Sequence, residues 1–375
     1  MKLRTSHGQR TLPGEYFTSP EIWRLEQERI FRRSWLLAGH VSELPQRGSY
    51  FLHQIGSESV IVLRDHSGQL RAHHNFCRHR GTRLCADSSG LLGNAIQCSY
   101  HAWTYGLDGT LRSAPNMREV AAFDKASWGL KPAALAEWRG FLFVNFAAGP
   151  QPFETFDVAL HAFAGKFEHW PLPELTSVHQ TIYEVEANWK LVFHNYSECY
   201  HCPTVHPHLN KLTPYRNTEN DLDEGPVLGG AMEMSNPQGS MTMHGACCAP
   251  PFAGLTAEER GRVYYYSLFP SAFLSLHPDY VLVHRVQPLA VDRTRVVCDW
   301  YFHPDAIAAT GFDAQPAIAF WDLTNRQDWA LCANAFRGVR SHAWEPGPYS
   351  EIESQLAAFD RYYLQMLNET GLNLQ

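Results

Sequence analysis

Two short Cys–His pairs in the first half of the chain could bind metal. Cys77 and His79 form the first pair, and Cys98 and His101 form the second after an interval of 18 residues. Two thiolates and two imidazoles can hold a structural zinc ion in a tetrahedral site. They can also hold a [2Fe–2S] cluster, with both Cys on one iron and both His on the other. Because zinc fingers usually place a Cys pair before a His pair, the alternating order favours the cluster. Cys85, between the pairs, is predicted to be a small buried residue.

A second group of possible metal ligands lies in residues 189–202, whose pattern predicts a helix. Glu198 and His201 are three residues apart, so we expect them on one face of that helix. Pro203 is expected to end or kink the helix, which lets His206 turn back toward His201. Two imidazoles and one carboxylate from elsewhere would form a facial triad, the arrangement typical of non-haem Fe(II). The same residues are also consistent with a His-rich helix end that makes ordinary hydrogen bonds.

The missing carboxylate must come from a distant part of the chain. Residues 316–340 predict a helix that offers Asp322 and Asp328. Asp328 shares its face with an apolar stripe formed by Trp321, Cys332 and Phe336. An acid in such a stripe needs a partner, because burial of an unpaired charge is costly. Asp322 falls on a polar face, so we prefer Asp328, with Asp279 as a weaker candidate.

The elements that must position these groups change in character along the chain. A helix is predicted at residues 19–35, with Ser19 as its N-cap and Pro20 in its first turn. Residues 35–146 predict short strands with Gly turns, followed by a linker. The linker is predicted at 147–152. Further strands are predicted at 178–187, 263–269, 280–287 and 294–302, and long irregular connections at 210–262. Helices are predicted at 316–340 and 350–368. Strands combined with long helices indicate an α+β domain.

The composition excludes several classes of protein. The chain has 375 residues, which suggests two domains, and a net charge of −7 without a basic block, which argues against nucleic-acid binding. No apolar run of about 18 residues occurs, so no membrane-spanning helix is predicted. The first residues lack an apolar signal region and the nine Cys are an odd count, so we predict a reducing, cytoplasmic location. Cys199 and Cys202 have the spacing of a redox pair, but no βαβ pattern surrounds them and no redox role is predicted.

The order Cys-x-His…Cys-x-x-His is that of a Rieske cluster. Together with the segment Asn188-Trp-Lys…Glu198-Cys-Tyr-His201-Cys-x(3)-His206-Pro, it resembles the catalytic α subunits of the Rieske non-haem iron oxygenases. The likeness covers nearly the whole chain in the family's order. The sequence Glu-Cys-Tyr-His-Cys is most similar to the branch that includes carnitine, choline and glycine-betaine oxygenases.

This resemblance implies a two-domain architecture of the α+β class. It implies an N-terminal all-β Rieske [2Fe–2S] domain at residues 36–148 and a C-terminal helix-grip (START-like) catalytic domain at 149–375. An N-terminal helical segment at 1–35 is expected to pack on the catalytic domain. His194 stands where many relatives carry an acidic residue, and we expect it to have a structural role.

The resemblance also implies roles for individual residues. The cluster ligands would be Cys77, His79, Cys98 and His101. The ligands of a mononuclear Fe(II) would be His201, His206 and Asp328. Glu198 would be a catalytic residue that bridges His101 of a neighbouring subunit to His201, and Asn195 is a second catalytic candidate. In the family this bridging runs across a head-to-tail trimer, so a homotrimer is expected.

The implied reaction uses O2 as co-substrate and electrons from NAD(P)H. A separate flavin/iron–sulfur reductase, with or without a ferredoxin, would pass them singly through the Rieske cluster. The best match for the substrate is a quaternary ammonium or betaine-like compound that undergoes N-demethylation or hydroxylation. The alternative is ring hydroxylation or dioxygenation of a small aromatic compound. Two more distant alternatives are a pure Rieske electron carrier and a zinc-dependent hydrolase.

A quaternary ammonium substrate would need an aromatic cage. The candidates for such a cage are Tyr196, Tyr264, Tyr265, Tyr266, Phe269 and Trp300. Each of these rings could equally be an ordinary part of a strand core. The methionines expected near the mouth of the pocket are Met232, Met234, Met241 and Met243.

Overall fold

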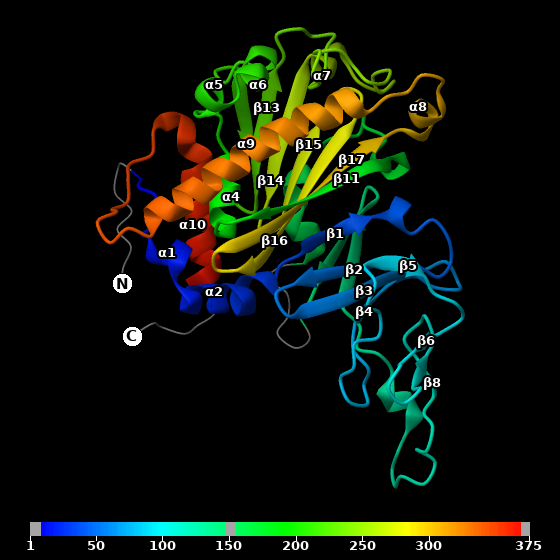
Figure 1. The fold of residues 1–375 in the computed structure, drawn as a ribbon. Helices are drawn as coiled ribbons and strands as arrows, with labels where there is room; N and C mark the ends of the chain where they lie inside the picture. The colour runs from blue at the N-terminus through cyan, green and yellow to red at the C-terminus, as the bar shows by residue number, and fades with distance from the viewer. Residues whose placement is uncertain (1–8, 148–154, 369–375) are drawn as a thin grey trace. The chain divides into compact units, whose positions relative to one another are not determined.

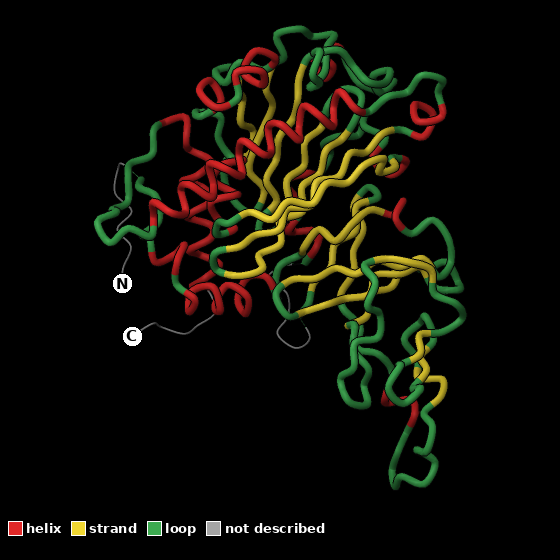
Figure 2. Tube along the Cα trace, viewed as in Figure 1, coloured by secondary structure: helices red, strands yellow, loops and turns green. Residues whose placement is uncertain are grey.

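The computed structural model describes residues 9–147 and 155–368 (Figures 1 and 2). The chain divides into one unit formed by Met1–Phe31 with Glu154–Gln375 and a second unit formed by Arg32–Phe153. The predicted linker at 147–152 lies outside the described residues, apart from Ala147. None of the described helices has the length and apolar character needed to cross a bilayer.

The unit Arg32–Phe153 is built from short antiparallel strands. They form a four-stranded sheet in the order β4-β3-β2-β5 and two three-stranded sheets, β1-β10-β9 and β6-β7-β8. The strands are β1 (Leu36–His40), β2 (Ser49–Ile55), β3 (Glu58–Arg64), β4 (Leu70–His74), β5 (Ser89–Leu91), β6 (Ile96–Gln97), β7 (Thr104–Tyr105), β8 (Leu111–Ser113), β9 (Ala134–Trp138) and β10 (Phe141–Asn145). The short 3-10 helices are η2 (Val41–Glu43) and η3 (Lys125–Trp128). Gly68 (φ 86°) and Gly109 (φ 87°) lie in the turns between β3 and β4 and between β7 and β8, where a left-handed backbone favours glycine.

The other unit is organised around a seven-stranded antiparallel sheet in the order β11-β17-β16-β15-β14-β13-β12. The strands are β11 (Thr176–Val185), β12 (Thr218–Leu222), β13 (Val227–Glu233), β14 (Arg262–Leu268), β15 (Ala272–Leu276), β16 (Val281–Ala290) and β17 (Arg293–Phe302). The long helix α9 (Gln315–Val339) lies across one face of this sheet, and α10 (Ser354–Asn368) lies beside it (Figure 1). A sheet that holds a long helix is the helix-grip, α+β arrangement that we predicted.

Shorter helices complete this unit. They are α1 (Glu15–Thr18), α2 (Pro20–Glu26), η1 (Gln27–Phe31), α3 (Phe156–Ala159), η4 (His161–Phe163), η5 (Leu172–Glu174), α4 (Trp189–Tyr196), α5 (Cys202–Val205), α6 (Pro207–Leu212), α7 (Ala257–Arg260), α8 (Pro304–Ala308) and η6 (Glu351–Glu353). Ser19 caps α2 by accepting a hydrogen bond from the Ile22 N–H, as predicted. The helical segment ends at Phe31, four residues before the predicted end at residue 35, and β1 begins at Leu36.

A buried charged cluster ties the first helices to the end of the chain. The Glu26 carboxylate accepts hydrogen bonds from Lys190 Nζ (2.5 Å), Trp189 Nε1 (2.8 Å) and the Tyr363 hydroxyl (2.6 Å). The Glu26 and Lys190 side chains are 0% exposed, so each charge depends on the other for its stabilisation. These contacts make the N-terminal helices part of the same core as α4 and α10.

Two predictions about this unit were wrong. The segment 210–262 was expected to be irregular, but it contains β12 and β13. Strand β13 escaped detection because of Gly229 and Gly230, which normally weaken a strand. Here both approach neighbouring backbones closely: a Cβ at Gly229 would lie 2.0 Å from the Tyr265 carbonyl oxygen, and one at Gly230 would lie 2.0 Å from that of Glu219. Strand β15 was also missed.

Candidate active site

Two loops with the same hydrogen-bond pattern carry the Cys–His pairs. In the first, the Cys77 N–H donates to the Thr82 carbonyl (2.8 Å) and the Gly81 N–H donates to the Cys77 carbonyl (2.9 Å). In the second, the Cys98 N–H donates to the Trp103 carbonyl (2.8 Å) and the Ala102 N–H donates to the Cys98 carbonyl (3.0 Å). The fourth residue after each Cys has a left-handed backbone, with φ of 76° at Gly81 and 54° at Ala102. Each loop therefore buries its Cys and holds its His at the tip.

The four side chains sort into a buried thiol pair and a more exposed imidazole pair. Cys77 and Cys98 are each 2% exposed and belong to the same buried cluster. The ring centroids of His79 and His101 lie 4.8 Å apart. Burial raises the pKa of the Cys98 thiol, but the N–H groups of Tyr100 and His101 outweigh it, so the pKa is lowered and the thiolate is favoured.

This arrangement fits a [2Fe–2S] cluster better than a single zinc ion. In a tetrahedral zinc site all ligand atoms crowd around one ion. Among the described residues, only His201, His206 and Asp328 gather three metal-ligating atoms within 4.8 Å of one another. Paired thiols beside paired imidazoles match a cluster with two irons, one ligated by Cys and one by His. Cys85 is 6% exposed, so it is the small buried residue that was predicted.

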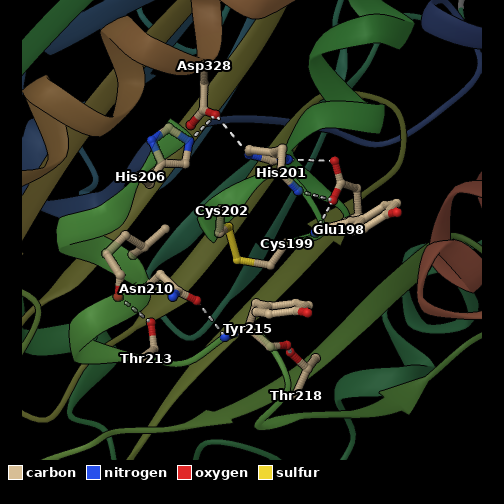
Figure 3. Close-up of a disulfide and its surroundings, with 12 residues drawn as sticks. Glu198, Cys199, His201, Cys202, His206, Asn210, Thr213, Tyr215, Thr218 and Asp328 are labelled. Atoms are coloured by element: carbon tan, nitrogen blue, oxygen red, sulfur yellow. Dashed lines mark hydrogen bonds and ion pairs between the residues drawn. A yellow bond between two sulfur atoms is a disulfide. The ribbon is translucent and has the colours of Figure 1, made fainter. Parts of the chain in front are cut away.

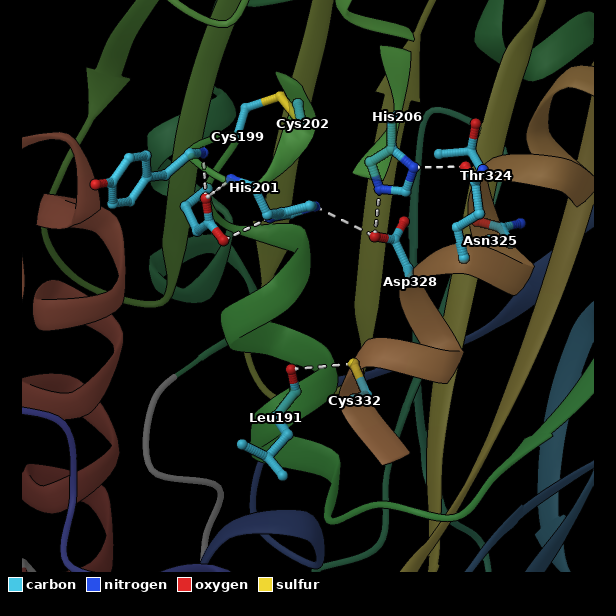
Figure 4. A network of polar contacts seen from close by, with 12 residues as sticks. Leu191, Cys199, His201, Cys202, His206, Thr324, Asn325, Asp328 and Cys332 are labelled. Carbon is cyan, nitrogen blue, oxygen red and sulfur yellow. Dashed lines mark hydrogen bonds and ion pairs between the residues drawn. A yellow bond between two sulfur atoms is a disulfide. The ribbon is translucent and has the colours of Figure 1, made fainter. Parts of the chain in front are cut away.

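The two imidazoles and the carboxylate of the second group converge. Asp328 Oδ1 lies 2.7 Å from His206 Nε2 and 3.3 Å from His201 Nε2 (Figure 4). Asp328 belongs to α9, which is fixed to α4 by a hydrogen bond from Cys332 Sγ to the Leu191 carbonyl (3.5 Å). Two Nε2 atoms that face one carboxylate form a set of donors suited to a divalent metal ion.

The opposite nitrogens of both rings have acceptors of their own. His201 Nδ1 lies 2.5 Å from Glu198 Oε1, and His206 Nδ1 lies 2.7 Å from Gln327 Oε1. If each Nδ1 carries the proton, each Nε2 lone pair is free for a metal. Burial lowers the pKa of His201, but Asp328 and Glu198 outweigh it and raise that pKa to about 9. The site therefore stabilises positive charge. Sequence reasoning missed Gln327, because nothing in its spacing signals which side chain it will meet.

The backbone around Glu198 differs from the prediction. Helix α4 ends at Tyr196, so Glu198 and His201 lie in a turn and not on one helix face (Figure 3). The Glu198 carboxylate accepts the N–H groups of Tyr200 and His201, which consequently do not extend the helix. Pro203 does not end a helix but lies in the first turn of α5, where its missing N–H is tolerated.

The same turn brings Cys199 and Cys202 together. Their Cα atoms lie 4.9 Å apart and their sulfur atoms form a disulfide (Figure 3). The spacing of this pair was noted in the sequence, but a disulfide was not predicted here.

The remaining candidates from the sequence lie elsewhere. Asp322 accepts from the Tyr183 hydroxyl (2.8 Å) and pairs with Arg326 (2.8 Å). Asp279 is buried, where it accepts from Ser240 Oγ (2.5 Å) and from the N–H groups of residues 248 and 249. Neither carboxylate reaches the two imidazoles. His194 is bonded to Asp360 (2.8 Å) within the core, which is the structural role expected for it.

A cavity of about 660 Å³ opens beside the candidate metal ligands. Its lining includes His201, His206, Asp328, Glu198 and Asn195. Of the predicted cage aromatics, only Tyr196 and Tyr265 line it, while Trp321, which was not predicted, does so as well. The rings of Tyr196 and Tyr265 lie 6.4 Å apart, and those of Tyr265 and Trp321 lie 6.1 Å apart. Among the methionines, Met232 lines the cavity, whereas the other three predicted at its mouth do not.

The fold and both sites define a class of protein, and comparison with known families identifies it. Residues 34–124 match the Rieske [2Fe-2S] domain, and residues 172–369 match the ring hydroxylating alpha subunit (catalytic domain). The chain belongs to the family of Rieske-type ring-hydroxylating oxygenase alpha subunits. It is an oxidoreductase that incorporates O2, with a Rieske cluster and a mononuclear iron as cofactors and a reductase as the source of electrons.

Within this family, the chain is similar to oxygenases whose names refer to quaternary ammonium compounds. The chain is 33% identical to the glycine betaine monooxygenase oxygenase subunit of Chromohalobacter salexigens, over 93% of this chain and 83% of the relative. It is 37% identical to the carnitine monooxygenase oxygenase subunit of Acinetobacter baumannii, over 52% of this chain and 53% of the relative. A crystal structure of the quaternary ammonium Rieske monooxygenase CntA with an inhibitor superposes with a TM-score of 0.82 at 25% identity, covering 96% of both chains.

These findings confirm the predicted family, fold class and cofactors. The two distant alternatives, a pure electron carrier and a zinc hydrolase, do not fit a chain that matches the catalytic domain of an oxygenase over residues 172–369.

Proposed function

We propose that this chain is the oxygenase component that oxidises a quaternary ammonium compound, releasing an N-methyl group as formaldehyde. The observation that carries the proposal is the aromatic wall of Tyr196, Tyr265 and Trp321 in the cavity that holds the candidate iron ligands. The faces of such rings attract a quaternary ammonium through cation–π contacts. The names of the two curated relatives support the same substrate class.

The proposal assigns the metal groups to particular side chains. The cluster would be held by Cys77, His79, Cys98 and His101, and the iron by His201, His206 and Asp328. When bound, the cluster supplies single electrons and the iron supplies the activation of O2. The aromatic wall orients the substrate and excludes water. Asn195, which lines the cavity, is proposed to contact the substrate.

Glu198 has a positioning role in this proposal. Its Oε1 accepts the Nδ1 proton of His201 and so keeps the Nε2 lone pair directed at the iron position. We propose that it also couples this site to His101 of a second copy in a homotrimer. His79 is exposed and His101 is half-buried, and both lie at loop tips, which supports such an intermolecular route. Domain boundaries at residues 35/36 and 148/149, a flavin/iron–sulfur reductase and a cytoplasmic location belong to the same proposal.

The experiment is a product assay with the purified holoenzyme, a generic NADH-dependent reductase and a panel of substrates. Glycine betaine, carnitine, choline and small aromatic acids are compared, and formaldehyde and hydroxylated products are quantified against NADH consumed. We expect formaldehyde with a quaternary ammonium substrate and none with the aromatic acids. The variant Glu198→Gln should lose most of this turnover, whereas Glu184→Gln, on the surface of β11, should retain it. A hydroxylated arene without formaldehyde would contradict the proposal.

A further inference from the structure

The charged groups around the cavity are unevenly distributed. Glu198 and Asp328 line it and are bonded to His201, while Glu351 adds a further acid. Among the described lining residues, Arg216 is the only lysine or arginine. A purely cationic substrate gains nothing from an arginine. A substrate that carries both a quaternary ammonium and a carboxylate would use the aromatic wall, the acids and the arginine together.

The guanidinium of Arg216 is held so that its far end is available. Its Nε donates a hydrogen bond to the Tyr215 hydroxyl (2.8 Å), and its carbon lies 5.5 Å from the centre of the Tyr215 ring. No carboxylate among the described residues lies within 4.0 Å of its nitrogens. With Nε occupied, the two terminal nitrogens remain as a fork that matches a carboxylate.

The loop that carries Arg216 is anchored next to the candidate iron ligands. The Tyr215 N–H donates to Asn210 Oδ1 (3.0 Å), and the Asn210 N–H donates to the His206 carbonyl (2.9 Å). The Thr218 hydroxyl donates to the Tyr215 carbonyl (2.9 Å). Figure 3 shows Asn210, Tyr215 and Thr218 grouped on the far side of the Cys199–Cys202 bridge from Asp328. Helix α6 thus connects the position of the arginine to that of His206.

We propose that Arg216 binds the carboxylate of a zwitterionic quaternary ammonium substrate and thereby selects it over choline. This inference rests on the proposed function and specifies its substrate class. The cavity volume of about 660 Å³ falls in the range that holds ligands larger than a simple betaine. The ammonium end lies on the aromatic wall, and the carboxylate end lies on the guanidinium fork.

The test measures binding, not turnover. L-Carnitine and choline, which both carry a quaternary ammonium and a hydroxyl, are titrated into the oxidised holoenzyme by calorimetry in the absence of reductase. The variant Arg216→Gln should weaken carnitine binding roughly tenfold or more, because a charge-assisted bidentate pair is lost. Choline binding should change less than about twofold, since choline offers no group to the fork. Arg216→Lys keeps the charge without the fork and should give an intermediate loss for carnitine.

Arg262→Gln is the matched control. Arg262, on strand β14, carries the same charge, but Glu258, Glu219 and Glu233 engage its guanidinium, and it does not line the cavity. Its replacement should leave both affinities unchanged. Equal weakening of carnitine and choline by Arg216→Gln, or no weakening of either, would overturn the assignment while leaving the proposed function intact. If the wild-type enzyme binds no quaternary ammonium compound at all, the proposed function itself fails.

Discussion

Replacing Gln327 by Met should weaken metal binding at the triad without disturbing the fold. The Gln327 side chain contributes one oxygen, which lies 2.7 Å from His206 Nδ1. Met has nearly the same length and shape but cannot accept a strong hydrogen bond. The imidazole of His206 is 1% exposed, so water cannot readily replace the lost acceptor.

The size of the effect follows from two contributions. A net hydrogen bond contributes about 0.5–1.5 kcal/mol, and a buried N–H left without a partner costs about 1–3 kcal/mol. Only the ring tautomer with the proton on Nδ1 can offer Nε2 to a metal, so this cost falls on the metal-bound state. We therefore expect iron affinity to drop roughly 10- to 100-fold, which agrees with the usual effect of removing such a partner.

The assay is an anaerobic titration of iron-depleted protein with Fe(II) against a competing chelator, with Co(II) as a spectroscopic substitute. Gln327→Glu should bind the metal at least as tightly as wild type, because a carboxylate is the stronger acceptor. Arg326→Gln is the control, since Arg326 is the adjacent residue but pairs with the exposed side of Asp322. Wild-type metal affinity in Gln327→Met would refute the argument that Nδ1 bonding selects the tautomer.

Three further changes test other features. Ala102 has a left-handed backbone (φ 54°), and the equivalent position in the other Cys–His loop is Gly81. Ala102→Gly should therefore raise the free energy of unfolding, measured in urea, by about 1 kcal/mol. A lower free energy of unfolding would show that Ala102 is not strained. Glu26→Ala leaves Lys190 buried without its counter-charge and should cost about 3–5 kcal/mol by the same measurement, and a loss below about 1 kcal/mol would contradict that argument. Burial raises the pKa of Asp279 to about 6, so the folded state holds this proton more tightly than the unfolded state, and the stabilisation is present at low pH and lost as the pH rises through about 6. The free energy of unfolding of wild type should consequently fall by roughly 1 kcal/mol relative to that of Asp279→Asn between pH 5 and pH 7.5. A difference between the two proteins that does not change with pH would contradict the raised pKa.

The sequence was most informative where chemistry and spacing coincide. The two Cys–His pairs and the imidazoles at residues 201 and 206 were identified as candidate ligands from residue type and spacing, because few other roles require those residues at those intervals. Asp328 followed from helix periodicity, since a carboxylate in an apolar stripe demands a partner. The family resemblance then supplied the fold that periodicity could not.

What the sequence could not supply were contacts between distant side chains. Gln327 and Trp321 carry no local signal, because their importance depends on which elements α9 meets. The end of α4 at Tyr196 depends on Glu198 capturing two N–H groups of the following turn, a local contact that competes with the helix. Likewise, Gly229 allows β13 to pack closely against β14, whereas the composition of this segment predicted a loop.

The carboxylate of Glu26 has a consequence for biosynthesis. Its partners are Lys190 and Tyr363, and Tyr363 lies 337 residues later in the chain. At about 5–20 residues per second, a ribosome needs roughly 20–70 s to make that interval. The unit Arg32–Phe153 ends its last strand, β10, at Asn145, so all its strands have been synthesised long before Tyr363. The unit formed by residues 1–31 and 154–375 cannot form the contacts between its first helices and α10 until α10 has been synthesised. A chain that lacks residues 1–31 would have no Glu26 carboxylate, so it could not complete that core however long it was given to fold.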